Sequence, residues 1–116
     1  MCERVGFDPG NRLMQQGDLA DAAYLIIDGH AEVILETSSG PVIVATVGTN
    51  EIVGEAGILS NAPRAATVRA KDRLIALRIP KETFMRMVRE FPTIAVSIMQ
   101  ELAQRLHRGN GNFSEY

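Results

Sequence analysis

The sequence predicts a mainly β fold in which short antiparallel strands form a sandwich or barrel and helices follow them. Glycines divide the first half into short apolar stretches at intervals of 7 to 12 residues. After Ile79 the spacing of apolar residues changes to one typical of helices. The length of 116 residues suits one hydrophobic core but not two, so residues 1–116 are predicted to form a single domain. The dividing glycines are Gly10, Gly17, Gly29, Gly40 and Gly48.

Six strands are predicted from the apolar stretches between these turns. Asp28–Gly29 separates two of the stretches and predicts a hairpin turn, because glycine adopts positive φ at no steric cost. The polar segment Thr37–Pro41 predicts a second hairpin loop. The predicted strands are Arg12–Met14, Ala23–Ile27, Ala31–Leu35, Val42–Val47, Ala65–Ala70 and Leu74–Ile79.

Two helices are predicted after the strands. Pro80 is suited to a helix start, and Lys81–Arg89 has apolar residues at helical spacing. Pro92 begins a second helix, on which apolar residues recur every four positions and define one face. The strands then occupy about residues 1–80, the helices about 81–108 and a loose tail 109–116. The apolar residues of the second helix are Ile94, Ile98, Leu102 and Leu106.

Composition excludes several classes of function. A formal net charge of −2 gives no support to nonspecific nucleic-acid binding. No apolar run is long enough to span a membrane, and the N-terminus lacks the apolar core of a signal peptide. Cys2 is the only cysteine, so no intrachain disulfide can form and a cytoplasmic location is expected.

The most informative segment is Gly54–Ala70, which reads GEAGILSNAPRAATVRA. Glu55 precedes Arg64 by nine residues, and small and apolar residues and a proline lie between them. The planar, permanently charged guanidinium of arginine can bind two oxygens of a phosphate. Small neighbouring residues let backbone N–H groups approach the same anion. A carboxylate such as Glu55 can accept a hydrogen bond from a hydroxyl group, so the segment combines residue types that can bind an anion and a hydroxyl.

This arrangement resembles the phosphate-binding cassette of cyclic nucleotide-binding domains. These sensors occur in protein kinase A regulatory subunits, catabolite-activator-type regulators and cyclic-nucleotide-gated channels. Gly17–Asp18, Tyr24–Ile26 and Gly29 also match the family's pattern, so the resemblance covers about residues 7–106. It implies a jelly-roll-like antiparallel β-roll of about eight strands, a short helix over residues 54–60 and two C-terminal helices.

The resemblance also implies a ligand and a set of binding residues. Glu55 would bind the ribose and Arg64 the cyclic phosphate. Ala65 lacks the hydroxyl that accompanies cGMP selectivity in the family, which favours cAMP over cGMP. Arg105 is a candidate lid over the base, with Leu102, Leu106 and His107 as alternatives. The candidate ligand residues are Gly54, Glu55, Ala56, Gly57, Arg64, Ala65 and Ala66.

The sequence departs from the family pattern at two positions and leaves alternatives open. Val53 replaces a usual phenylalanine, and Gly57 replaces a usual alanine. The alternative to a ligand site is an ion pair between Glu55 and Arg64 in a non-binding scaffold for protein–protein contact. The chain is either a stand-alone sensor or a sensor fragment of a larger transcription regulator or channel, and its effector is unknown.

An enzyme is not predicted. His30 and His107 are the only histidines, too few for the metal site of a cupin-type enzyme. No serine, histidine and aspartate combination has the spacing of a nucleophilic triad. The expectation is therefore a regulatory domain with no catalytic residues, no metal and no cofactor besides its ligand.

Overall fold

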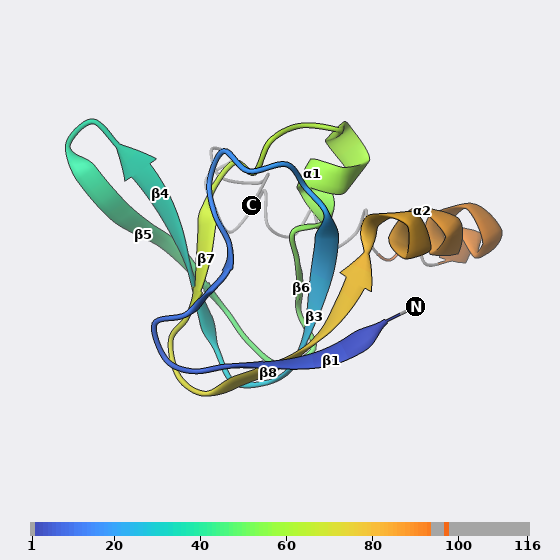
Figure 1. Cartoon of the computed structure of the whole chain (residues 1–116), viewed down its shortest axis with the longest axis horizontal. Coiled ribbons are helices and arrows are strands. Elements are labelled where there is room, and N and C mark those ends of the chain that lie inside the picture. Colours follow the sequence, from blue (N-terminus) through green and yellow to red (C-terminus); the bar gives the residue numbers. More distant parts are fainter. Residues whose placement is uncertain (1, 94–96, 98–116) are drawn as a thin grey trace.

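The computed structural model describes residues 2–93 and 97, and its strands form two four-stranded antiparallel sheets (Figure 1). One sheet has the order β1-β8-β3-β6 and the other the order β2-β7-β4-β5. Helix α1 (Glu55–Ser60) lies between β6 and β7, and α2 (Lys81–Glu90) follows β8. The strands are β1 (Glu3–Phe7), β2 (Arg12–Met14), β3 (Ala22–Asp28), β4 (Ala31–Thr37), β5 (Gly40–Val47), β6 (Ile52–Val53), β7 (Thr67–Ala70) and β8 (Leu74–Pro80).

The predicted mainly β, antiparallel fold of eight strands is confirmed, and so are the short helix and the first C-terminal helix. No strand was predicted over β1 or over the two-residue β6, and the strand predicted from Ala65 begins two residues later, at Thr67. Pro92, Thr93 and Ser97 are helical, as the predicted second helix requires. The apolar face predicted for that helix lies outside the described residues.

The predicted hairpin at Asp28–Gly29 is wrong, because β3 and β4 belong to different sheets. Gly29 does have positive φ, but its turn leads the chain from one sheet to the other. A Cβ atom on Gly29 would lie 2.5 Å from the backbone oxygen of Arg73, so the close approach of two turns also requires glycine there. The hairpin between β4 and β5 is confirmed by the pairing of Thr37 with Gly40.

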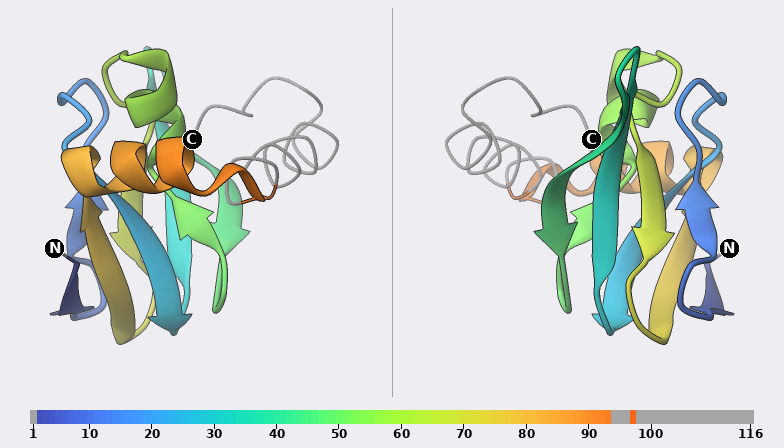
Figure 2. Two further views of the ribbon diagram at one scale, coloured as in Figure 1. Left: turned by 90° about the vertical axis from the view of Figure 1, so that its right-hand side faces the viewer. Right: turned by 90° about the vertical axis from the view of Figure 1, so that its left-hand side faces the viewer.

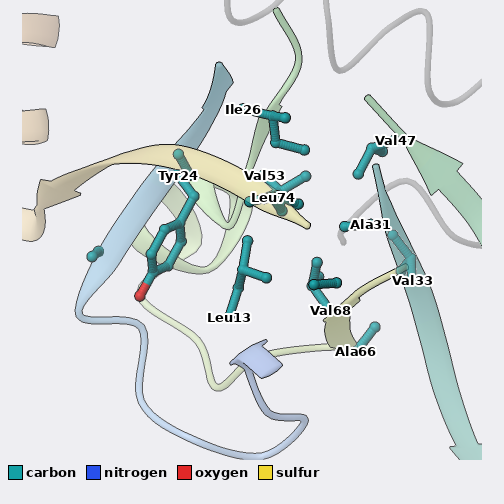
Figure 3. Packing of buried hydrophobic residues seen from close by; sticks show 13 residues of the cluster. Leu13, Tyr24, Ile26, Ala31, Val33, Val47, Val53, Ala66, Val68 and Leu74 are labelled. Atoms are coloured by element: carbon teal, nitrogen blue, oxygen red, sulfur yellow. The ribbon is translucent and has the colours of Figure 1, made fainter. Parts of the chain in front are cut away.

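The hydrophobic core lies between the two sheets, and strand alternation supplies its side chains. Val33 of β4 and Val68 of β7 are fully buried on one side, and Ile26 of β3 and Leu74 of β8 are fully buried on the other. These side chains point toward one another in Figure 3. Val53 of β6 and Val68 of β7 also belong to this core, which thus fixes the two strands that flank the candidate ligand segment.

A second apolar cluster attaches both helices to the roll. Phe84 of α2 is 2% exposed and packs with Ile58 of α1, Ala23 of β3 and Ile79 of β8. Figure 2 shows α2 lying across the strands next to α1. Because one side chain contacts both helices and the sheet, Phe84 connects α1 with the C-terminal part of the described chain.

An exposed pair joins two turns at the end of the roll away from α1 (Figure 1). The ring Nδ1 of His30 lies 2.8 Å from Asp72 Oδ2, and the backbone N–H of His30 donates to Asp72 Oδ1 at 2.7 Å. These hydrogen bonds lower the pKa of Asp72 below its ordinary value of 3.8. A lowered carboxyl pKa contributes stability above the ordinary value, and that stability is lost as pH falls through the folded-state value.

Asp72→Asn is therefore expected to reduce stability at pH 7, and the difference from wild type should shrink below about pH 4. Urea unfolding between pH 7 and pH 3 measures this difference. A difference that stays constant over the whole range would show that the ionised carboxylate of Asp72 contributes nothing.

Candidate ligand-binding site

The candidate site begins at Gly54, the N-cap of α1, whose φ of 86° is unfavourable for other residues. A Cβ atom there would lie 2.8 Å from both Arg64 Nη1 and Met14 Cε. At the other end of α1, Asn61 has φ of 53°, and the N–H of Ala62 donates to the oxygen of Gly57. This left-handed C-cap ends the helix after six residues and turns the chain back toward Arg64.

Arg64 lies in the interior with 5% of its surface exposed, and protein oxygens surround its guanidinium. Nη1 donates to the backbone oxygen of Gly54 at 2.6 Å, and Nη2 donates to that of Ala22 at 2.5 Å. Nη2 also lies 3.5 Å from Asp21 Oδ1. The side chain therefore connects the start of α1 with the start of β3.

The backbone of Arg64 also hydrogen-bonds the loop between β2 and β3. Its N–H donates to Asp18 at 2.8 Å, and its carbonyl accepts from Gly17 at 2.9 Å. The nearby N–H of Gln16 donates to the hydroxyl of Thr67 at 3.0 Å. The loop between β2 and β3 and the segment after α1 are therefore fixed to each other by main-chain contacts as well as by the guanidinium.

Burial and the neighbouring charges have opposite effects on the pKa of Arg64. Burial lowers the pKa of Arg64 from its ordinary value, while the charges of Asp21, Tyr24 and Glu55 raise it. Arginine stays protonated in proteins, so the guanidinium remains a cation. Glu55 is completely buried in the first turn of α1, where the helix dipole favours a negative charge. The structure thus brings the two charged residues singled out in the sequence into one electrostatic environment.

The remaining predicted residues lie around this pair. Ala56 and Gly57 are partly buried in the first turn of α1, Ala66 is buried, and Ala65 is exposed directly after Arg64. A small, exposed residue thus directly follows the buried Arg64. Arg105 and the alternative lid residues lie outside the described residues.

Asp21 and Arg78 lie at this site and were not among the residues predicted from the sequence. Asp21 Oδ1 faces Arg64, and Oδ2 accepts from Arg78 Nη2 at 3.2 Å. The backbone oxygen of Asp21 accepts from the N–H of Lys81 at the start of α2. The only sequence signal was the position of Asp21 directly before an apolar strand.

A cavity of about 470 Å³ lies beside the site, between the β2–β3 loop, the end of α1 and the start of α2. Asp21, Arg78 and Lys81 line it. Of the seven candidate ligand residues, it touches Gly57 alone. The cavity therefore makes Asp21 and Arg78 accessible from solvent but is distinct from the interior position of Glu55 and Arg64.

Gly57 is explained by the close approach of α1 to the β2–β3 loop. A Cβ atom at Gly57 would lie 2.9 Å from the Cβ of Ala20. Helix propensity favours alanine over glycine by about 1 kcal/mol, whereas overpacking costs about 1 to 3 kcal/mol.

Gly57→Ala is therefore expected to destabilise wild type by about 1 kcal/mol but to stabilise an Ala20→Gly variant. Urea unfolding of the four proteins measures both effects, and an equal effect in both backgrounds would contradict the steric explanation.

Within residues 2–93, no three histidine, cysteine, aspartate or glutamate side chains are grouped so that they could hold a metal ion. Over the same residues, no helix has the length and hydrophobicity needed to cross a membrane.

Comparison with known proteins places the site in context. The family model described as the cyclic nucleotide-binding domain matches residues 4–91. The cAMP-dependent protein kinase regulatory subunit of Yarrowia lipolytica is 37% identical over 81 residues, which are 70% of this chain and 21% of that protein. Lysophospholipase nte1 of Aspergillus oryzae is 30% identical over 105 residues, 90% of this chain. The chain spans only 7% of that lysophospholipase.

Solved structures agree with the sequence comparisons. The catabolite activator protein of Thermus thermophilus superposes with a TM-score of 0.84 and 26% identity, over 94% of this chain and 52% of that one. A cyclic nucleotide-binding domain from Methylobacillus flagellatus gives a TM-score of 0.86 at 20% identity, over 97% of this chain and 66% of that one. The second likeness concerns the fold alone.

Proposed function

Because the chain belongs to the cyclic nucleotide-binding domain family, we propose that it is a sensor for cAMP, with cGMP as the weaker ligand. The observation that supports this most directly is the buried, charged Arg64, fixed by two backbone carbonyls beside the exposed Ala65. A buried cation held in one orientation is suited to an anion that carries one negative charge.

The proposed roles follow from the chemistry of each residue. Arg64 binds the exocyclic oxygens of the cyclic phosphate, and Glu55 accepts a hydrogen bond from the ribose 2′-hydroxyl. Gly54, Ala56, Gly57, Ala65 and Ala66 leave space for the ligand to approach the backbone. Ala65 offers no hydroxyl to the amino group of guanine, which is the reason for preferring cAMP.

We further propose that ligand occupancy is relayed through the helix that begins at Pro92, with Arg105 or a neighbouring residue over the base. Phe84 supports such a relay, because it packs against Ile58 of α1 and lies on the helix directly before Pro92. A ligand can move this helix only to the extent that it binds the closed state more tightly. The chain is assigned no catalysis, and the activity of the lysophospholipase relatives is not transferred to it.

Isothermal titration calorimetry with cAMP, cGMP and linear 5′-AMP tests the binding proposal. One site per chain is expected, with cAMP bound more tightly than cGMP and 5′-AMP bound most weakly. Absence of heat with all three nucleotides would favour the alternative, a non-binding scaffold for protein–protein contact.

Hydrogen exchange measured with and without cAMP tests the relay. Protection is expected at residues 54–66 and also at residues 93–106, with 5′-AMP as the control ligand. Protection limited to residues 54–66 would mean that the C-terminal helix is not a lid.

A further inference from the structure

The carboxylate of Asp21 lies between two guanidinium groups, one from each side. Its Oδ1 is 3.5 Å from Arg64 Nη2, and its Oδ2 is 3.2 Å from Arg78 Nη2. The side chain of Arg64 is 3% exposed, that of Arg78 29% and that of Asp21 70%. The three residues form a charge cluster of two cations and one anion that extends from the interior to the surface.

Arg78 reaches this position independently of Arg64. It is directly opposite Tyr24 in the pairing of β8 with β3, and its guanidinium interacts with the Tyr24 side chain, which contributes to raising the pKa of Arg78. Asp21 is fixed at the same end of β3, where its backbone oxygen accepts from the N–H of Lys81. The sheet therefore holds Arg78 against the outer oxygen of Asp21, whatever occupies the inner side of the site.

The orientation of Arg64 does not depend on Asp21. The carbonyls of Gly54 and Ala22 accept from Arg64 at 2.6 and 2.5 Å, whereas Asp21 lies a full 3.5 Å away. The contribution of Asp21 to Arg64 is thus mainly electrostatic. A carboxylate paired with Arg64 alone would offset the positive charge that a ligand anion needs, and Arg78 opposes this effect by pairing with the other oxygen.

We propose that Arg78 is a positioning residue for the ligand anion. Arg78 neutralises Asp21, so that the charge of Arg64 remains available to the phosphate. The inference rests on the proposed function, because it concerns the affinity of the same site. With Arg78 present the cluster has one net positive charge, and without Arg78 it has none. The affinity of the site for an anion is thereby set partly by a residue that does not touch the anion.

The decisive experiment measures cAMP affinity of the full chain by calorimetry. Arg78→Gln is expected to weaken binding by about threefold to tenfold, the size expected for one partly screened charge. Adding Asp21→Asn to Arg78→Gln restores the net charge and should return affinity to within about twofold of wild type. Arg78→Lys retains the charge and should bind nearly as wild type does. Raising the salt concentration should reduce the Arg78→Gln effect.

The matched control is Arg73→Gln. Arg73 pairs with Asp8 at 2.8 Å, is well exposed and lies in the turn between β7 and β8, away from α1 (Figure 1). Arg73→Gln removes the same charge as Arg78→Gln but at a residue that does not pair with Asp21. Its affinity for cAMP should therefore equal that of wild type. If Arg78→Gln binds as wild type does, or if the double variant binds no better than Arg78→Gln, the inference is wrong.

A ligand-free arm separates this inference from the proposed function. Asp21→Asn leaves Arg64 and Arg78 as neighbouring cations, so its urea midpoint should fall, and adding Arg78→Gln should raise the midpoint again. Equal urea midpoints for these two variants would mean that the charges of Arg64 and Arg78 do not affect each other. A wild-type chain that binds no cyclic nucleotide refutes the proposed function and the inference with it, whereas wild-type binding with an unaffected Arg78→Gln refutes the inference alone.

Discussion

Replacing Arg64 by alanine is expected to weaken cAMP binding by about thirtyfold to several thousandfold. Removing one partner of a buried charge pair costs about 2 to 5 kcal/mol, which corresponds to that range of affinity. The loss is large because Arg64 is the only cation of the cluster that is almost completely buried, and water screens its charge little. Calorimetric titration of wild type and Arg64→Ala with cAMP measures the change.

Stability must be measured on the same variants. Arg64→Ala leaves the carbonyls of Gly54 and Ala22 without this donor, and an unsatisfied buried polar group costs about 1 to 3 kcal/mol. Arg64→Lys keeps the charge but loses the planar fork, so it should bind more weakly than wild type but better than alanine. The matched control is Arg69→Ala. Arg69 lies on β7, and its Nη2 is 3.1 Å from Oε1 of Glu32. Arg64→Ala binding as tightly as Arg69→Ala would disprove the assignment of the phosphate to Arg64.

Replacing Phe84 by alanine is expected to lower the free energy of unfolding by about 3 to 5 kcal/mol, the usual range for a buried phenylalanine. The phenyl ring is 2% exposed and fills the space between α1, α2 and the β3–β8 part of the sheet. A loss of this size is a large part of the stability of a small domain, which is about 5 to 15 kcal/mol. Urea unfolding followed by circular dichroism measures the difference.

Phe91→Ala is the matched control, since this ring is 55% exposed directly after α2. Its effect should lie within about 0.5 kcal/mol of wild type. Phe84→Leu should recover part of the stability by refilling the cavity. Similar losses for Phe84→Ala and Phe91→Ala would show that the second apolar cluster does not attach α2 to the roll.

The sequence was informative where local rules decide the structure. Glycine turns and apolar alternation located six of the eight strands, and the family resemblance carried by Gly54–Ala70 located the helix α1. These features depend on residues close together in the chain. The edge strand β1 was missed because ERVGF shows no clear alternation, and β6 is too short to form a pattern.

What the sequence did not reveal depends on contacts between distant residues. A turn at Asp28–Gly29 was predicted, but whether it joins two strands of one sheet or two sheets is decided by pairing with β8 and β5. The association of Asp21 with Arg64 and Arg78 spans 43 and 57 residues, and none of these residues signals the others locally. Aspartate is common in loops and turns for backbone reasons, so the residue type at position 21 gave no indication of an electrostatic role.

The pairing of β1 with β8 has a consequence for the folding kinetics. Glu3 pairs with Arg78 and Phe7 with Leu74, so the first strand of the described residues pairs only with the last of them. Such a topology has a high contact order, and the entropy of closing the intervening loop must be overcome before the pairing stabilises anything. During synthesis, β1 therefore emerges long before its partner and stays unpaired while the intervening strands are made. Pairing of β1 with β8 is therefore expected to be a late step in folding. Until β1 has paired, the edge of β8 that will bind it is open to other chains.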